Sequence, residues 1–295
     1  MTTLLCGAVE AGGTKFICEV ADSAGAILDH VRIPTTTPQH TLAEVIAFFA
    51  RHETPHARFG AFGLAAFGPL DTRAASPTYG HILQTPKPQW SGTDLVGPFA
   101  RRFACPVRID TDVNAAALAE ARDGAGRGCA LVVYLTVGTG IGGGICIAAG
   151  ALPTSLHPEM GHIRVLRHRD DRDFAGVCPF HGDCVEGLAS GPALAARLTG
   201  VQEWERADHV NEVIGYYLGQ LVANVILMLS PQRIIIGGGV MTNAELLPEI
   251  TRSAARLLNG YAGISAPALH DMIVRPGLGE RSGIAGALAL AQGCL

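Results

Sequence analysis

The segment LLCGAVEAGGTKFICEVAD, residues Leu4–Asp22, decides the architecture of the first part of the chain. Two apolar runs flank the pair Gly12-Gly13, a pattern typical of a strand, a tight glycine turn and a second strand. The segment YLTVGTGIGGGICIAAGA, which begins at Tyr134, repeats this pattern. Two such units at the starts of the two halves of the chain indicate an internal duplication.

Helices and strands alternate through the remaining sequence. Glu205–Leu229 carries an apolar stripe at the helical period and is followed by Pro231, which ends helices. The other predicted helices are Thr41–His52, Val113 to about Arg122, Ser190–Leu198 and Gly283–Gln292, and the other strands are Phe59–Ala65, Val107–Ile109 and Arg233–Ile236. This alternation predicts an α/β protein with a parallel or mixed sheet.

The length of 295 residues suits two domains rather than one core. We expect a small N-terminal α/β domain at 1–115, completed by a C-terminal helix at about 283–295. A larger α/β domain is expected at 116–282.

Composition and charge exclude several classes of protein. The net charge is −4 and no basic block exists, so a nucleic-acid partner is not expected. The eight cysteines are scattered apart from Cys178 and Cys184. No signal peptide precedes the first predicted strand, so we expect a cytoplasmic protein with reduced thiols.

One uncharged stretch is long enough to suggest a membrane helix. Gly128–Pro158 contains no Asp, Glu, Lys or Arg, and a spanning helix needs only about 20 apolar residues. However, its apolar pieces are short, β-branched and interrupted by glycines. Two buried strands joined by a glycine turn therefore fit better, and no membrane partner is expected.

The run CPFHGDCVE, residues Cys178–Glu186, has the spacing of a metal site. Cys178, His181 and Cys184 with the upstream His162 can close a tetrahedral zinc shell, because zinc favours thiolate and imidazole donors. A disulfide or two unrelated thiols is the alternative. Glu159 and Glu186 flank these residues. The metal would therefore hold two carboxylates in place as a polar ligand site.

Three glycine clusters follow apolar strands: Gly12-Gly13-Thr14-Lys15, Gly138-Thr139-Gly140 and Gly237-Gly238-Gly239. Glycine lets backbone amides approach a phosphate, and hydroxyl and ammonium groups add to such a nest. Each cluster alone could be an ordinary turn, but three together favour phosphate binding. The GxGxxG fingerprint lacks its strand–turn–helix context and the Walker A pattern is absent, so a simple dinucleotide-binding unit and a P-loop enzyme are excluded.

Asp112 lies in IDTDVNAAA, directly after a predicted strand and at the start of a predicted helix. Asp112 or Thr111 could simply cap that helix. Asp110, Asp112 and Asn114 also form a polar group at a strand's carboxyl end, where open α/β sheets bind ligands. Near phosphate nests, Asp112 could accept a proton from a sugar hydroxyl that attacks a γ-phosphoryl group.

Several of these motifs together resemble the ROK sugar kinases (repressor, open reading frame, kinase) of the actin-like ATPase superfamily, and most closely their bacterial fructokinase branch. The resemblance runs nearly end to end and is carried by EAGGTKF (Glu10–Phe16), TDVNAAALAE (Thr111–Glu120), VGTGIGGG (Val137–Gly144), HPEMGH (His157–His162), CPFHGDCVEGLASGP (Cys178–Pro192) and IIIGGGVM (Ile234–Met241). As a set, these motifs are far more specific than any glycine turn.

The resemblance implies two ribonuclease-H-like domains with an active-site cleft between them, and ATP-dependent phosphorylation of a hexose, first of all D-fructose to fructose 6-phosphate. Asp112 is implied as the catalytic base. The implied sugar-binding residues are Thr111, Glu159, His162 and Glu186, and the implied structural zinc ligands are His162, Cys178, His181 and Cys184. The implied phosphate loops are Gly12–Lys15 and Gly138–Gly140, with Gly237–Gly239 on the adenosine side, magnesium accompanying ATP, and a homodimer.

Three positions depart from the wider family. Glu10 stands where many members have Asp, which could alter how the water shell of magnesium is held. The metal loop is C-x-x-H-x-x-C rather than the commoner three-cysteine pattern. Thr111 stands where glucokinase-like members often have Asn, which argues against assuming glucose. All three departures fit the fructokinase branch.

Other functions remain open. A glucokinase, mannokinase or broad-specificity hexokinase is the main alternative. A sugar-sensing, non-enzymatic regulator is disfavoured, because family repressors carry a helix-turn-helix ahead of the first strand, which here begins at about Leu4. A metal-dependent hydrolase is disfavoured because four protein ligands leave zinc no open position.

Overall fold

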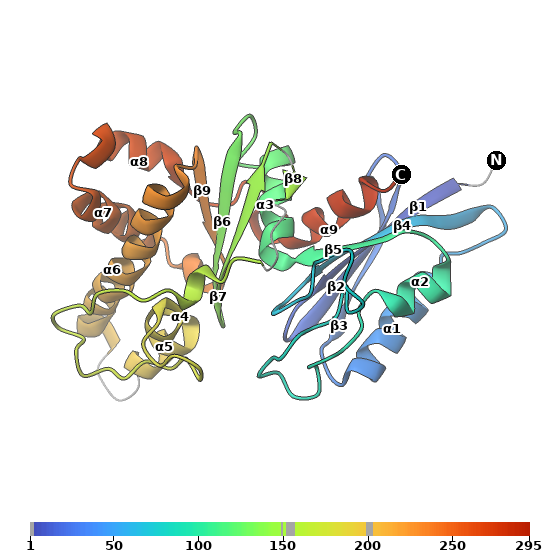
Figure 1. Cartoon of the computed structure of the whole chain (residues 1–295), viewed down its shortest axis with the longest axis horizontal. Helices are drawn as coiled ribbons and strands as arrows, with labels where there is room; N and C mark the ends of the chain where they lie inside the picture. Colours follow the sequence, from blue (N-terminus) through green and yellow to red (C-terminus); the bar gives the residue numbers. More distant parts are fainter. Residues whose placement is uncertain (1–2, 149, 152–156, 199–202) are drawn as a thin grey trace. The chain divides into compact units, whose positions relative to one another are not determined.

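The computed structural model describes residues 3–148, 150–151, 157–198 and 203–295 (Figure 1). The chain forms two compact units. The first comprises Met1–Glu120, Gly150–His157 and Arg281–Leu295, and the second comprises Ala121–Ala149 and Pro158–Glu280. Gly150 and Ala151 form an edge strand of the sheet of the second unit and are described with that sheet below.

The first unit is built on a five-stranded mixed sheet of order β3-β2-β1-β4-β5. β1 pairs antiparallel with β2 and parallel with β4, and β5 continues the parallel part. The strands are β1 (Thr3–Ala11), β2 (Lys15–Asp22), β3 (Ile27–Pro34), β4 (Ala57–Ala66) and β5 (Val107–Thr111), and the helices are α1 (Pro38–Ala50), α2 (Gly97–Phe103), α3 (Asp112–Asp123) and α9 (Ser282–Gln292). β1, the glycine turn and β2 agree with the prediction from Leu4–Asp22.

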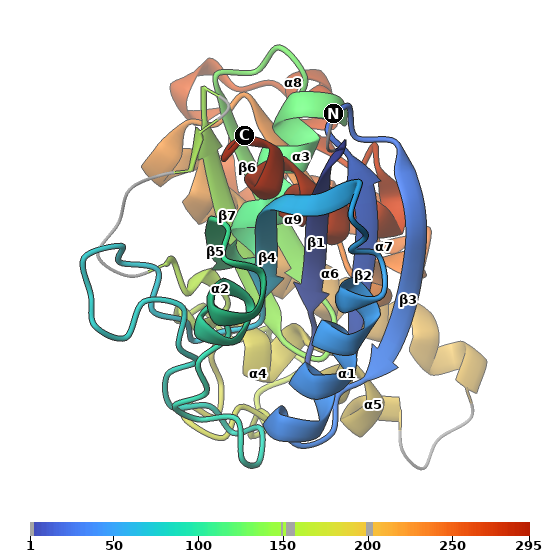
Figure 2. The same ribbon diagram turned by 90° about the vertical axis from the view of Figure 1, so that its right-hand side faces the viewer.

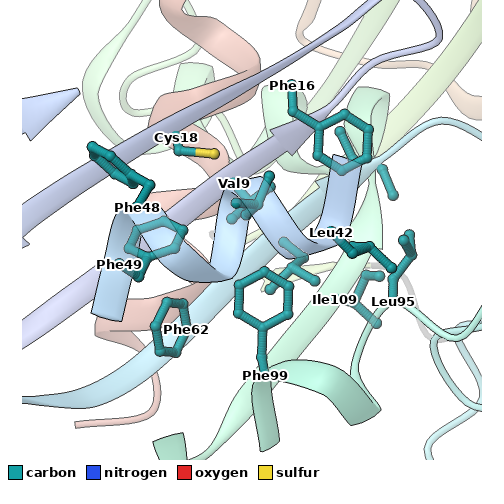
Figure 3. Packing of buried hydrophobic residues seen from close by; sticks show 14 of the residues in the cluster. Val9, Phe16, Cys18, Leu42, Phe48, Phe49, Phe62, Leu95, Phe99 and Ile109 are labelled. Atoms are coloured by element: carbon teal, nitrogen blue, oxygen red, sulfur yellow. The ribbon is translucent and has the colours of Figure 1, made fainter. Parts of the chain in front are cut away.

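Alternating residues of β1 feed two different cores, because successive side chains of a strand point to opposite faces. On the face covered by α1 and α2 (Figure 2), a large aromatic cluster is buried. Figure 3 labels ten of its members: Val9, Phe16, Cys18, Leu42, Phe48, Phe49, Phe62, Leu95, Phe99 and Ile109. The opposite face buries small residues such as Cys6 and Ala8 against α9. A Cβ on Gly63 would overlap the Ala287 carbonyl oxygen, so the backbones of β4 and α9 are in close contact.

The second unit repeats the same topology. Its sheet has the order β10-β9-β6-β7-β8, with β6 antiparallel to β7 and parallel to β9. The strands are β6 (Leu131–Val137), β7 (Ile141–Ile147), β8 (Gly150–Ala151), β9 (Arg233–Gly237) and β10 (Ile273–Val274). Read from the other edge, this is the strand order of the first sheet, which agrees with the predicted duplication. The uncharged stretch that could have been a membrane helix thus forms β6 and β7.

The helices of the second unit include a long buried one. The α-helices are α4 (Val185–Ala189), α5 (Gly191–Leu198), α6 (Glu203–Leu229), α7 (Leu246–Leu258) and α8 (Ala266–Met272), and the 3-10 turns are η1 (Met160–His162), η2 (Gly239–Thr242), η3 (Tyr261–Gly263) and η4 (Gly279–Arg281). Among the described residues, His209–Leu229 of α6 is the stretch long and apolar enough to span a membrane, but 67% of its most apolar window is buried in the protein. Gly215 and Gly219 let α6 approach α7 closely, since a Cβ on either would crowd Glu249 or Ser253.

Candidate active site and metal centre

The first glycine cluster forms the tight turn between β1 and β2. The Gly12 amide donates to the Lys15 carbonyl at 3.0 Å, and a Cβ on Gly12 would lie 2.7 Å from that oxygen. Thr35 closes the turn from β3's side, donating its hydroxyl to the Gly12 carbonyl at 2.8 Å. Beyond its own chain neighbours, no atom of the described residues lies within 4 Å of the position of a Cβ on Gly13. The turn is therefore fixed at Gly12 and open at Gly13, as a phosphate nest requires.

Glu10 ends in an unusual environment just before this turn. Its Oε2 is buried and has no hydrogen-bond partner in the part of the chain that the structure describes. Burial raises the pKa of Glu10 to about 7, the negative charge of Asp112 adds to the rise, and Lys15 opposes it. A carboxylate in this setting is favoured by a nearby cation. The position therefore fits a residue that faces magnesium or its water shell.

Thr111, rather than Asp112, is the N-cap residue of α3. Thr111 Oγ1 accepts the Asn114 amide at 3.2 Å, three residues on, which is the hydrogen bond of an N-cap. Asp112 itself is the first residue of α3 and is half-buried, with Oδ1 accepting the Val113 amide at 2.9 Å. Its negative charge contributes to the raised pKa of Glu10. Asp112 thus stands at the carboxyl end of β5, parallel to β4 and β1.

Asp110 lies at the same strand end and binds the start of α3 through hydrogen bonds. Its Oδ1 accepts the Thr111 amide at 2.7 Å and the Asn114 side-chain amide at 2.9 Å. Burial raises the pKa of Asp110, and His157 is among the groups that lower it. His157 is 8% exposed. The sequence contained His157 in the HPEMGH motif but gave no reason to place it near Asp110.

The other two glycine clusters are neighbours in the second unit. A Cβ on Gly138 would lie 4.0 Å from the backbone nitrogen of Gly239, and one on Gly238 would overlap the backbone of Val137. Gly238 has φ 96°, a conformation that favours glycine. In the part of the chain that the structure describes, no atom outside its immediate chain neighbours lies within 4 Å of the position of a Cβ on Gly239. The Gly138–Gly140 turn and the Gly237–Gly239 turn therefore make one continuous backbone surface that is open at Gly239.

Gly191 is a member of this surface that the sequence prediction missed. Its amide donates to the Gly138 carbonyl at 2.7 Å, and its Cβ position lies 3.0 Å from the same oxygen. Gly191-Pro192 ends the CPFHGDCVEGLASGP motif and lies in the predicted helix Ser190–Leu198, but neither pattern indicated a contact with Gly138. Because α5 begins at Gly191, the predicted metal loop (Cys178–Cys184) is linked to the Gly138–Gly140 turn, the predicted phosphate turn, through α4 and α5.

Gly143 of β7 and Gly161 of η1 have a packing role. A Cβ on Gly143 would overlap the Met160 side chain, and one on Gly161 would overlap the Ile141 carbonyl oxygen. These two glycines seat the PEMGH turn on β7. As a result, the predicted sugar residues Glu159 and His162 are held at the two ends of η1.

Glu186 meets this arrangement from α4. Its Oε2 accepts the Ile141 amide at 3.0 Å and lies 2.8 Å from the position of a Cβ on Gly140. Ile141 therefore contacts both Gly161 through its carbonyl and Glu186 through its amide. Glu186 therefore contacts the residue that follows the Gly138–Gly140 turn, and the turn that carries Glu159 and His162 packs on the same residue through Gly161.

The four predicted metal ligands converge. The ligand atoms of His162, Cys178, His181 and Cys184 all lie within 4.8 Å of one another. His162 Nδ1 is 3.8 Å from Cys178 Sγ and 3.5 Å from Cys184 Sγ. Tetrahedral zinc with its usual bond lengths would separate a sulfur and a nitrogen ligand by about 3.6 Å. The donor set and the spacing therefore fit zinc, and the disulfide alternative is wrong because all eight cysteines are free.

The backbone of the metal loop is shaped for this purpose. The Cys178 and Gly182 backbones exchange hydrogen bonds of 3.2 and 2.9 Å. Gly182 has φ 65°, and a Cβ on Gly187 would overlap the Gly182 carbonyl oxygen. Arg164 donates to the His181 carbonyl at 3.0 Å and also pairs with Asp183. The loop is thus a closed knuckle, with Cys184 at the start of α4.

The whole chain is similar to known sugar kinases. The sequence profile of the ROK family matches residues 6–293. A fructokinase of Zymomonas mobilis is 46% identical over 289 residues, which cover 97% of this chain and 95% of that protein. A glucokinase of Streptomyces coelicolor is 28% identical, with 96% of both chains covered.

The fold has the same relatives. The crystal structure of a ROK family glucokinase from Streptomyces griseus in complex with glucose and AMPPNP superposes with a TM-score of 0.75, at 28% identity and with 99% of both chains covered. A ROK hexokinase from Thermus thermophilus superposes with a TM-score of 0.78, at 26% identity and with 98% of both chains covered. The expected ribonuclease-H-like, actin-like ATPase fold is confirmed.

Proposed function

Because the chain belongs to the ROK family, we infer that it transfers the γ-phosphoryl group of ATP to a hexose, and that the hexose is D-fructose, giving fructose 6-phosphate. The observation that carries the choice of sugar is the grading of similarity. Relatives called fructokinase are 39–46% identical, whereas those called glucokinase are 27–28% identical.

Asp112 acts in this proposal as the general base. Its carboxylate takes the proton of the sugar hydroxyl while that oxygen attacks the γ-phosphorus and the bond to the ADP oxygen breaks. Thr111 caps α3, and Asp112 lies at the carboxyl end of β5, where α/β sheets bind ligands; this position supports the role. Gly12–Lys15 in the first unit and Gly138–Gly140 in the second would donate amides to the phosphates, with Thr14, Thr139 and Lys15 adding polar contacts.

The sugar would be bound by Glu159, His162 and Glu186, with Thr111 as a further contact. Carboxylates form strong, charge-assisted hydrogen bonds to hydroxyl groups. The contact of Glu186 with Ile141, on which the turn carrying Glu159 and His162 also packs, supports this assignment. Gly237–Gly239 would line the adenosine side of ATP.

Two metal ions are part of the proposal. Zinc, held by His162, Cys178, His181 and Cys184, would order the metal loop and hence the position of Glu186. Magnesium would accompany ATP and neutralise phosphate charge, with Glu10 facing its water shell. The unpartnered Oε2 of Glu10 supports the second assignment.

We further propose that the chain acts in the cytoplasm as a homodimer, without a nucleic-acid or membrane partner. The net charge of −4 supports the absence of a nucleic-acid partner, and the burial of α6 supports the absence of a membrane partner. Light scattering on the purified protein measures the oligomer directly.

Coupled turnover of ATP with fructose, glucose and mannose tests the function. We expect kcat/KM to be highest for fructose. A higher kcat/KM for glucose or mannose would assign a glucokinase, mannokinase or broad hexokinase instead. Absence of turnover with all three sugars, with sugar binding retained, would indicate a sugar-sensing regulator.

A further inference from the structure

Arg275 lies where two parallel strands of the second sheet end. β10 pairs with β9 in parallel, with Ile273 opposite Ile234 and Val274 opposite Ile235. Arg275 directly follows β10, and Gly237 ends β9. Pro276 packs against Gly237, since a Cβ there would lie 2.9 Å from Pro276 Cγ. Arg275 therefore shares the carboxyl edge of the sheet with the third glycine cluster, and this edge is where α/β sheets bind ligands.

The guanidinium of Arg275 binds the backbone that follows this cluster. Nη1 donates to the Met241 carbonyl, and Nη2 donates to the Asn243 carbonyl at 3.1 Å and to the Ala244 carbonyl at 3.4 Å. These carbonyls lie at and just beyond the end of η2. A cation is favoured there because the last carbonyls of a helical turn have no partner within it.

Other contacts of this loop are local or weaker. Thr242 donates its hydroxyl to the Gly239 carbonyl at 2.8 Å, and the Asn243 side chain donates to Asn211 of α6 at 2.9 Å. Both of these involve neutral groups, whereas a hydrogen bond from a charged donor is stronger. Of these three side chains, Arg275 is the one that joins the loop to the end of β10 and supplies a charge.

We propose that Arg275 is a positioning residue for the nucleotide: by binding the carbonyls of Met241, Asn243 and Ala244, it fixes the loop that presents Gly238 and Gly239 to ATP. The proposal rests on the assignment of Gly237–Gly239 to the nucleotide. Gly239 is open on the side of its missing Cβ and adjoins Gly138 of the phosphate turn. A change in the position of the loop would therefore alter ATP binding and leave the predicted sugar residue Glu186, next to Ile141, in place.

Lysine is not an equivalent residue at this position. The planar guanidinium offers several donors in a fixed fork, whereas an ammonium group is a compact charge on a flexible stem. Arg275→Lys keeps the charge and loses part of the geometry. Arg275→Ala removes both.

Arg233 provides a matched control. It also donates to a backbone carbonyl, that of Asp271, but it stands at the first residue of β9, four residues before Gly237 and at the opposite end of the strand. Arg233→Lys therefore changes the same type of contact in the same sheet without changing the glycine edge.

The experiment measures KM for ATP, KM for fructose and kcat for the full chain and the three variants, with Kd for a fluorescent ATP analogue in the absence of sugar and thermal unfolding. We expect Arg275→Ala to raise KM for ATP and Kd for the analogue by on the order of ten-fold, the effect of losing one charged hydrogen bond. Arg275→Lys should lie between Arg275→Ala and the parent, while KM for fructose stays within about two-fold, and Arg233→Lys should match the parent.

Two results would overturn the proposal. One is an unchanged nucleotide constant in Arg275→Lys and Arg275→Ala. The other is an equal rise of both substrate constants. If Arg275→Ala does not fold, Arg275→Lys decides by the same criteria. A parent protein that binds the analogue but phosphorylates no hexose would refute the proposed function, while the binding constants of the variants would still test Arg275.

Discussion

Glu186 Oε2 accepts a hydrogen bond from the Ile141 amide at 3.0 Å, and this contact joins the metal loop to the phosphate turn. Cys184, two residues before Glu186, is a predicted metal ligand, and Gly138–Gly140 directly precedes Ile141. One carboxylate oxygen of Glu186, a predicted sugar-binding residue, is therefore hydrogen-bonded to the backbone next to the Gly138–Gly140 turn. Glu186 can bind sugar and order the phosphate turn at the same time, a coupling that the sequence did not indicate.

Two substitutions separate these two duties of Glu186. Glu186→Gln keeps an oxygen that can accept from Ile141 but removes the charge, so it should raise KM for fructose by on the order of ten-fold and KM for ATP much less. Glu186→Ala removes the acceptor as well, so it should raise both constants. Steady-state kinetics check this, with Glu280→Gln on the surface as control. Identical kinetics for the two Glu186 variants would contradict the coupling.

Loss of the metal should unfold the loop. Elemental analysis of protein purified without added metal should find one zinc per chain. Cys184→Ser should lose it and lower Tm, because metal binding is linked to folding of its ligands. Cys129→Ser, outside the cluster, should keep zinc and Tm. A native parent protein that contains no zinc, together with an unchanged Tm in Cys184→Ser, would show that the four residues are not a metal centre.

Gly13 separates phosphate binding from stability in the first unit. No atom lies within 4 Å of a Cβ placed on Gly13, so Gly13→Ala should leave Tm nearly unchanged. The added methyl group should still keep phosphate from the nest and raise KM for ATP several-fold. An unchanged constant would remove the Gly12–Lys15 turn from the nucleotide site.

The stability of the first unit should fall in acid through Asp71. The hydrogen bonds from Arg73, followed by that from Ser76, hold the pKa of this carboxyl well below its usual range, and its side chain is fully buried. A lowered pKa contributes stability above the unfolded value of about 4 and loses it as pH falls further.

Asp71→Asn lacks this contribution. The difference in unfolding free energy between the parent and Asp71→Asn should be constant above about pH 5 and shrink below pH 4. Denaturant unfolding at several pH values measures it. Asp123→Asn, in an exposed ion pair, should show almost no difference at any pH. A difference that grew in acid would contradict the assignment.

Local patterns predicted much of this protein, because strand–turn–strand units and metal spacing are written in consecutive residues. The structure brings the four predicted metal ligands together and forms the predicted β1–β2 turn, while zinc binding stays a prediction. Contacts between distant segments were not predictable: Gly191 with Gly138, Glu186 with Ile141, and Arg275 with Met241 depend on the packing of elements. Gly143 is a further case, since the room it makes for the Met160 side chain depends on how the PEMGH turn packs on β7.

The turnover of Asp112→Asn with ATP and fructose tests the central claim most directly. The amide keeps the size of the side chain and can still accept from Val113, and Thr111 continues to cap α3. Fold and fructose binding should therefore persist, while kcat falls by about 10² to 10⁴-fold, the range for loss of a general base. Near-normal kcat with unchanged substrate constants would contradict the account and leave Asp112 without a role in catalysis.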